Sequence, residues 1–157
     1  MKFLTNPLRG FVALVISTVA LSTQADCSLK QVHDGTVTSQ SSGLMWRQCL
    51  IGQTGRQCEI GEADGFNWVN ALNRARGSEL AGFYNWRMPK INELESLMTF
   101  CIKQTSVISG ISDGLIWSAS ANLDFATEAW SYNIATGKRE IARRHEAVFV
   151  LLVRDIE

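Results

Sequence analysis

The sequence has little of the residues from which catalytic and metal sites are most often built. It contains two histidines, two prolines and four cysteines in 157 residues. No two cysteines lie two to four residues apart, and only His33 and His145 supply imidazoles, so the spacing does not favour a zinc site. Serine-hydrolase, zinc-protease and glycine-rich phosphate-loop motifs are missing too. We therefore expect no cofactor, no metal and no catalytic residue set.

The sequence also lacks an excess of charge of one sign. The formal net charge of the whole chain is zero. Without residues 1–25 the balance is about −2, because that segment holds two basic residues and no acidic ones. Such a balance excludes general attraction to nucleic acid. Any anion-binding surface must therefore be local.

The only long apolar run stands at the start of the chain. Lys2 and Arg9 form a basic beginning, Phe11–Ser22 is an apolar core, and Ala25 is a small residue at the expected cleavage position. This order predicts a signal peptide over residues 1–25. A membrane span needs about 20 apolar residues, so an anchor is disfavoured. We expect an exported protein, periplasmic or at the cell surface, with no membrane segment after cleavage.

The remaining 26–157 has the length of one domain with a single core. It carries all four cysteines, Cys27, Cys49, Cys58 and Cys101. An even number after an export signal predicts two disulfides, although three pairings are compatible with the sequence. We favour Cys49–Cys58, which closes a short polar loop, together with Cys27–Cys101, which ties down the new N-terminus.

The first half of this domain shows strand, loop and helix patterns in turn. Asp34–Trp46 has β-branched residues around a serine- and glycine-rich turn, which predicts two short strands. Cys49–Gly65 is glycine-rich and polar and reads as loop. Asp64–Gly77 has apolar residues at helical spacing, and we expect a helix with Asp64 as its N-cap.

The segment around Trp86 combines charge with an apolar stripe. Pro89 suits the start of a helix, and Ile91 begins a stripe that predicts this helix. We expect Glu93 and Glu95 to be first-turn carboxylates that point to different faces, since residues two apart on a helix do not face each other.

The last third predicts β-structure. Gly114–Ser120 is typical of a strand, and Glu128–Arg144 of a hairpin that turns at Thr136–Gly137. Ala147–Asp155 is apolar on both faces, which indicates a central buried strand. Together the segments predict an α+β domain in which the first and last strands pair.

Five motifs in order carry a family resemblance. They are "DGTVTSQSSGLMW", "WVNAL", "WRMPKINEL", "IWSAS" and "AVFVLLVR", between Asp34 and Arg154. With them the chain resembles the Lcl C-terminal domain family, found at the end of bacterial collagen-like adhesins and in short exported proteins. The resemblance implies a single compact C-type lectin-like domain, related also to sulfatase-modifying domains, with two helices on one small, mostly antiparallel sheet.

The resemblance also implies attachment to surfaces or acidic glycans, and it supplies no catalytic residues. Two departures stand out. Lys90 lies where the family often has threonine or asparagine, and the chain has no collagen-like Gly-X-Y region. Six residues of the motifs are interpreted as scaffold rather than as a sugar-stacking platform or an anion clamp. They are Trp46, Trp86, Arg87, Pro89, Trp117 and Trp130.

One basic cluster is the candidate ligand surface. It consists of Lys138, Arg139, Arg143 and Arg144. On a strand Arg139 and Arg143 would share one face, and Lys138 and Arg144 the other. Such cations could bind a sulfated or carboxylated glycan, or they could be a solvated hairpin edge that charge protects from aggregation.

The sequence therefore predicts an exported, disulfide-bonded binding module whose partner is an acidic glycan or a surface protein. The alternative is an enzyme, or an accessory subunit of an envelope enzyme, whose site forms only in three dimensions. A structural piece of a larger assembly is a third reading. The oligomeric state is not predicted.

Overall fold

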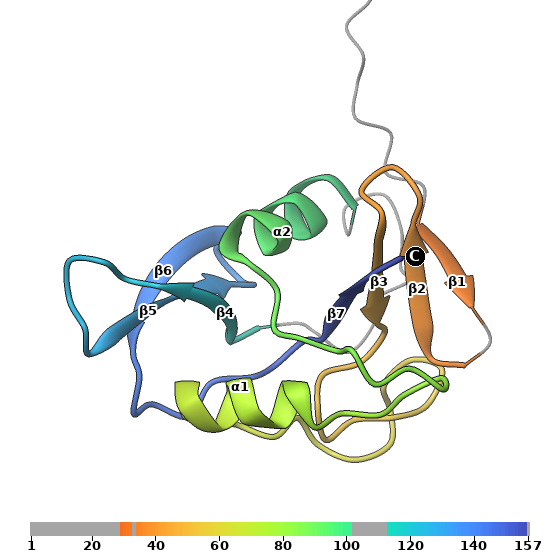
Figure 1. Ribbon diagram of the computed structural model, residues 1–157, viewed down its shortest axis with the longest axis horizontal. Helices are drawn as coiled ribbons and strands as arrows, with labels where there is room; N and C mark the ends of the chain where they lie inside the picture. The colour runs from red at the N-terminus through yellow and green to blue at the C-terminus, as the bar shows by residue number, and fades with distance from the viewer. Residues whose placement is uncertain (1–28, 33, 102–112, 157) are drawn as a thin grey trace, which may run out of the picture.

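The computed structural model describes residues 29–32, 34–101 and 113–156. These residues form an α+β fold with two helices and two small antiparallel sheets (Figure 1). In chain order the elements are β1 (Leu29–Val32), β2 (Thr36–Ser39), β3 (Leu44–Arg47), α1 (Trp68–Arg76), α2 (Ile91–Ser96), the π-helical turn η1 (Leu97–Cys101), β4 (Leu115–Ala121), β5 (Glu128–Asn133), β6 (Lys138–Arg143) and β7 (Val153–Asp155).

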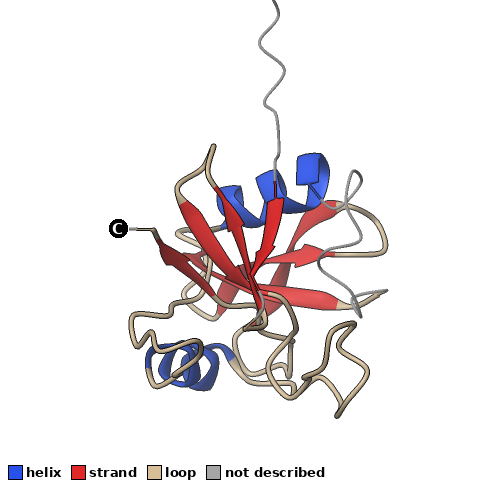
Figure 2. Ribbon diagram, turned by 90° about the vertical axis from the view of Figure 1, so that its right-hand side faces the viewer, coloured by secondary structure: helices blue, strands red, loops and turns tan. Residues whose placement is uncertain are grey.

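The prediction of an α+β fold is confirmed, but the prediction of one sheet is wrong. One sheet has the strand order β1-β2-β3-β7 and the other the order β4-β5-β6. Helix α2 packs against all three strands of the second sheet, and α1 contacts β4. The helices lie on opposite sides of the layer of strands (Figure 2).

The first sheet is built around the predicted hairpin. Strands β2 and β3 pair with Val37 opposite Trp46, and Gly43 has a φ of +66° in the turn between them. That left-handed conformation suits glycine. The C-terminal strand β7 pairs with β3, the second strand of this hairpin, so the predicted pairing of the first strand with the last is wrong. Strand β1, which the sequence did not predict, covers the free edge of β2.

Helix α1 begins later than the sequence suggested. Its N-cap is Asn67, whose side-chain oxygen accepts a hydrogen bond from Asn70 N at 2.9 Å, so the assignment of Asp64 is wrong. The backbone explains the difference. Asp64 N donates to the carbonyl of Ile51, and Phe66 forms a bridge with Val148. These long-range bonds hold residues 64–66 extended and delay the helix.

Helix α2 starts where Pro89 predicted, directly after the N-cap Lys90. Glu93 lies in the first turn, and its carboxylate accepts from Lys90 N at 2.7 Å. Glu95 lies beyond that turn, because the helix begins at Ile91, and this corrects its predicted position. The two carboxylates do point to different partners, as expected. Glu93 pairs with Arg87 and Glu95 with Arg139.

The second sheet follows the sequence closely. Strand β4 and the hairpin β5–β6 lie where the alternation predicted them, with Gly137 in the turn at a φ of +68°. Trp130 and Tyr132 point to the side of α2 and share a hydrophobic cluster with Leu94 of that helix. Ala129 belongs to the other cluster, on the side of α1.

The apolar C-terminal segment is buried as predicted, but only its end is a paired strand, and that strand, β7, lies at the edge of its sheet rather than at the centre. Val150, Leu151, Leu152 and Val153 are fully buried. Its backbone changes partners along its length, from Phe66 and Leu115 at one end to Arg87 and β3 at the other. This exchange between the two sheets keeps 148–152 out of a regular ladder.

The C-terminal segment also divides the core. Val148, Val150 and Leu152 belong to one hydrophobic cluster, with Trp86 and Trp117. Leu151 and Val153 belong to the other, and Phe149 packs against it. Successive side chains of an extended segment point to opposite sides, so this one segment contributes to both clusters.

One of the two predicted disulfides lies within the described residues. Cys49 and Cys58 are bonded, with Cα atoms 5.4 Å apart. No described cysteine is free. Cys27, the expected partner of Cys101, lies outside the described residues, so that bridge stays a prediction.

The burial of Trp86 gives a test of the core. Its side chain is 2% exposed and its Nε1 donates to the carbonyl of Leu80 at 3.3 Å. We expect Trp86→Ala to lower the free energy of unfolding by about 3–5 kcal/mol, measured by urea denaturation. Tyr84→Ala is the matched control, since Tyr84 is 68% exposed, and should leave stability nearly unchanged. Equal stability of both variants would contradict the burial of Trp86.

Candidate functional site

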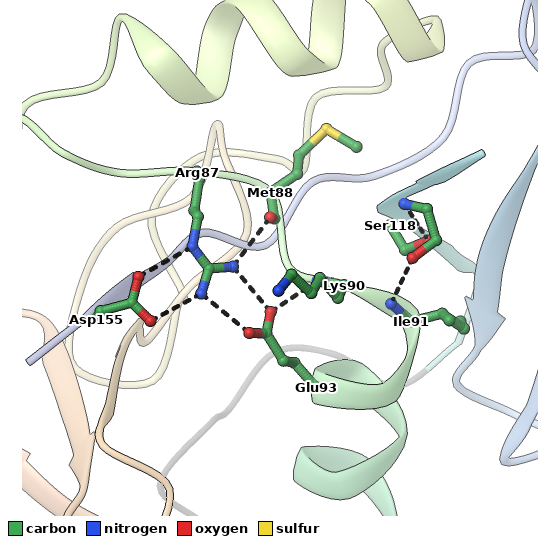
Figure 3. A network of polar contacts seen from close by, with 8 residues as sticks. Arg87, Met88, Lys90, Ile91, Glu93, Ser118 and Asp155 are labelled. Atoms are coloured by element: carbon green, nitrogen blue, oxygen red, sulfur yellow. Dashed lines mark hydrogen bonds and ion pairs between the residues drawn. The ribbon is translucent and has the colours of Figure 1, made fainter.

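Arg87 is the centre of a charge network between α2 and β7 (Figure 3). Its two terminal nitrogens donate to the two carboxylate oxygens of Glu93 at 2.8 and 2.9 Å. Asp155 accepts from Nη2 at 3.1 Å and from Nε at 3.4 Å. All three guanidinium nitrogens of Arg87 therefore donate to groups of the chain itself. The arrangement is a structural ion-pair network and leaves no open site for an anion.

The network shifts the charge equilibria of its members. Hydrogen bonds from Arg87 hold the pKa of the Asp155 carboxyl below its ordinary value. The hydrogen bond to Glu93, followed by those to Asp155, raises the pKa of Arg87. At neutral pH the network holds one cation between two carboxylates, so its three members carry a net charge of −1. The network therefore ties the start of α2 to the last strand.

Three of the five tryptophans are buried and the other two are partly buried. Trp46, Trp86 and Trp117 are buried, and Trp130 packs against the core. Trp117 Nε1 donates to the carbonyl of Phe66 at 2.7 Å, and Trp68 Nε1 to the carbonyl of Ser118 at 2.9 Å. Their ring faces therefore do not form an exposed sugar-stacking platform. Pro89 is also buried, and its carbonyl accepts from Ala119 N at 2.7 Å.

The four predicted ligand-binding cations divide into two kinds. All of them lie on the edge strand β6 or directly after it. Arg139 forms an ion pair with Glu95 of α2. Arg144 stacks on the Trp68 ring at 4.3 Å and donates to the carbonyl of Glu128 at 3.0 Å. These two side chains hold the hairpin to the helices on either side.

Lys138 and Arg143 are the other two members. Both are exposed, and neither takes part in an ion pair between described residues. Glu128 lies opposite Arg143 on β5, but its carboxylate accepts from Asn122 at 2.9 Å. We call Lys138 and Arg143 the β6 cations. They are the part of the predicted cluster that remains available to a ligand.

A second candidate site is a cleft beside the disulfide loop. The loop returns on itself, so that a Cβ at Gly52 would lie 2.2 Å from the carbonyl oxygen of Glu62. Gly52 also has a φ of +97°, and only glycine fits this close, left-handed turn. The Cys49–Cys58 bond closes the same loop. The loop, the turn between β1 and β2, and the end of β3 line a cleft of about 360 Å³.

Most residues that line the cleft are polar, and they carry charges of both signs. Its lining includes Gln31, Asp34, Arg47, Gln48, Gln53 and Arg56. Gln48 is 3% exposed, and both ends of its side-chain amide are hydrogen-bonded. Its oxygen accepts from Gln31 at 3.2 Å, and its nitrogen donates to the carbonyl of Arg56 at 2.6 Å. We call this site the Arg47 cleft.

Arg47 is the charged group at the base of this cleft. Nη2 donates to the carbonyl of Gln53 at 2.8 Å, and no ion pair between described residues includes Arg47. Burial, and then repulsion from Arg74, lower the pKa of the guanidinium. The group stays protonated at neutral pH, because even a lowered arginine pKa is far above it.

Residues 35–154 match the family model of the Lcl C-terminal domain. The chain belongs to the Lcl C-terminal domain family. The search of curated proteins found no match. The matched residues include both helices, strands β2 to β6, most of β7, the β6 cations and most of the Arg47 cleft.

The Arg47 cleft was not predicted from the sequence. Cys49–Gly65 was recognised as loop, but Arg47 was given no role. A signal was present, since arginine directly follows the apolar strand residues of "LMW" and stands two positions before a disulfide cysteine. In the described part of the chain there is no group of acidic, histidine and cysteine side chains fit to hold a metal ion. No helix there is long and apolar enough to cross a membrane.

The Arg87 network predicts a pH-dependent contribution to stability. Because the pKa of Asp155 is lowered in the folded state, its ionised form stabilises the fold above the ordinary pKa of about 3.9, and this contribution is lost as pH falls through the lowered pKa. Asp155→Asn should therefore reduce the free energy of unfolding at neutral pH, by less than about 1 kcal/mol since Asp155 is exposed. At acidic pH the difference from the parent should vanish.

Urea denaturation at neutral and acidic pH measures this difference. Asp124→Asn is the control, because Asp124 is exposed and its carboxylate makes no ion pair with a described residue. A difference for Asp155→Asn that grows on acidification would show that the network does not stabilise the fold.

Proposed function

We propose that this chain is an exported binding module that attaches to a surface through an acidic glycan. Membership of the Lcl C-terminal domain family supports a surface-associated role. The Cys49–Cys58 disulfide supports export, since such bonds persist in oxidising compartments. The proposal includes the signal peptide over residues 1–25, which lies outside the described residues. It also includes the kinship with C-type lectin-like domains, with which two small antiparallel sheets are compatible.

The observation that carries the proposal is the exposure of the β6 cations. Lys138 and Arg143 extend from an edge strand that is fixed by Arg139 and Arg144 at the two neighbouring helices. The two cations stand at the two ends of β6 and, being five residues apart, point to opposite faces of it, so the strand presents them to a ligand that runs along its free edge. Sulfate and carboxylate groups along a polysaccharide present a repeated negative charge to such a strand.

Binding is favoured over catalysis by the chemistry of the cleft. Its group with a shifted pKa is Arg47, and an arginine does not exchange protons near neutral pH. Cys49 in the lining is part of a disulfide and is no nucleophile. The lining holds one carboxylate, Asp34, but no histidine and no free thiol that could act with it, so binding is the function that the geometry supports best.

The test is retention on heparin across a salt series. In the variant Lys138→Gln/Arg143→Gln the contacts of Arg139 and Arg144 stay intact, so the fold should be preserved. We expect this variant to elute at lower salt than the parent. Exposed charge contacts contribute about 0.2–1 kcal/mol each and are screened by salt, so retention should fall steeply as ionic strength rises.

The control variant is Lys30→Gln/Arg76→Gln. It removes two exposed cations, from β1 and from the end of α1, that form no ion pair with described residues. It should elute like the parent, because these cations are not on β6. Equal elution of parent and both variants, at equal melting temperatures, would show that the β6 cations are only a solubilising edge.

A further inference from the structure

We propose that the Arg47 cleft binds a small carboxylate whose neighbouring carbon carries a hydrogen-bond donor, the chemistry that α-amino acids and α-hydroxy acids share. The cleft is separate from the β6 cations in sequence and in its lining. Its volume of about 360 Å³ is at the lower end of the range for small-molecule sites. The ligand is therefore a small acid rather than a polymer segment.

The first observation is that Arg47 keeps unused donors on the solvent side. One of its nitrogens is bonded, to the carbonyl of Gln53. Among the described residues, one buried side-chain nitrogen or oxygen atom has no hydrogen-bond partner. This atom is Gln53 Oε1, and it is not an atom of Arg47. The remaining guanidinium nitrogens of Arg47 form no hydrogen bond with a described residue, and since they are not among the buried atoms without a partner, they reach solvent. They are therefore accessible to a ligand.

Two other arginines that are at least partly buried, Arg87 and Arg154, have a carboxylate or an aromatic ring as a partner for the guanidinium group, unlike Arg47. Arg87 is compensated by two carboxylates. Arg154, which is 4% exposed, donates to Asn85 at 2.8 Å and stacks on the Phe83 ring at 3.9 Å. Among the described residues, Arg47 has neither a carboxylate nor an aromatic ring as a partner. A partly buried cation without such partners is costly, and a bound anion removes that cost.

The electrostatic surroundings favour an anion at this position. Arg74 is close enough to Arg47 to lower its pKa, and Arg56 is a second cation in the lining. Asp34 is a lining carboxylate, but it forms no ion pair with Arg47. A guanidinium with free donors matches a carboxylate in shape and charge.

The cleft also offers acceptors for a donor on the ligand. Asp34 is exposed, and one of its oxygens accepts from Thr36 Oγ1 at 2.7 Å, which fixes the carboxylate and leaves capacity for a second bond. Gln53 Oε1 is buried without a donor, and the broad terminal torsion of glutamine allows it to turn toward one. An ammonium or hydroxyl group beside the ligand carboxylate would supply that donor.

The walls are held in place before any ligand arrives. The disulfide closes the loop, and Gln48 links β1 to the loop through Gln31 and Arg56. Strand β3 is fixed by the bond from Arg47 N to the carbonyl of Leu152 at 2.9 Å. A preorganised cleft loses little conformational entropy on binding.

The experiment compares four ligands of one shape by nitrogen-15 NMR of the oxidised protein. Leucine and leucic acid have the carboxylate and a neighbouring donor. Isocaproate has the carboxylate without the donor, and leucinamide has the donor without the carboxylate. We expect saturable shifts at the amides of Gln48, Gln53 and Thr54 with leucine or leucic acid, weaker binding of isocaproate, and no saturation with leucinamide.

Two variants assign the roles of the side chains. Arg47→Gln should weaken binding of the better ligand by roughly tenfold or more, since a charge-assisted hydrogen bond is lost. Arg76→Gln is its matched control and should bind like the parent. Asp34→Asn keeps an oxygen for Thr36 but loses the charge. This variant should weaken the binding of leucine, whose donor is an ammonium group, more than the binding of leucic acid, whose donor is a hydroxyl group.

The results separate the sources of the ligand. Preference for leucine in the parent, lost in Asp34→Asn, identifies an amino acid, whereas preference for leucic acid identifies a hydroxy acid, and either outcome supports the proposal. No saturable shift with either ligand, equal binding of leucinamide, or unchanged binding by a folded Arg47→Gln would each overturn it. If Arg47→Gln does not fold, the comparison of leucine with leucinamide and the Asp34→Asn variant decide. Heparin retention is independent of these outcomes, because it tests the β6 cations.

Discussion

The structure depends on one buried segment, residues 148–153, which belongs to neither sheet alone. Phe149 exchanges backbone hydrogen bonds with Leu115 and Trp117 of β4, while Val153 exchanges them with Arg87. The side chains alternate between the two hydrophobic clusters. Two sheets of three and four short strands bury little surface separately. Because the segment contributes side chains to both hydrophobic clusters, the apolar surface that it buries stabilises both sheets together.

Both candidate binding surfaces are positioned through this segment. The Arg47 cleft is anchored to it on two sides, by the bonds from Arg47 N to Leu152 and from Ile51 N to Val150. The β6 cations lie at the far edge of the sheet that Phe149 joins. The Arg87 network closes the arrangement by fixing α2 to β7, two residues after the segment ends. Sites at two edges of one rigid scaffold can bind separately.

Local chemistry allowed much of this to be predicted from the sequence. Alternation identified β4 to β6, Pro89 located α2, and the spacing of Cys49 and Cys58 indicated their bond. Long-range backbone bonds account for the errors. The bridge between Phe66 and Val148 delays α1, and the change of partners along the last segment produces two sheets instead of one. Arg47 was missed because its lack of an ion pair with any described residue is a property of three dimensions.

Native-state hydrogen exchange tests directly whether residues 148–153 make the two sheets one cooperative unit. The amides to follow are those of Arg47, Ile51 and Trp117, which donate to Leu152, Val150 and Phe149. The account predicts that all three exchange with the same free energy of opening, equal to that of global unfolding and equally sensitive to denaturant. A lower free energy for Trp117, with Arg47 and Ile51 still protected, would show that the second sheet opens by itself and would contradict the account.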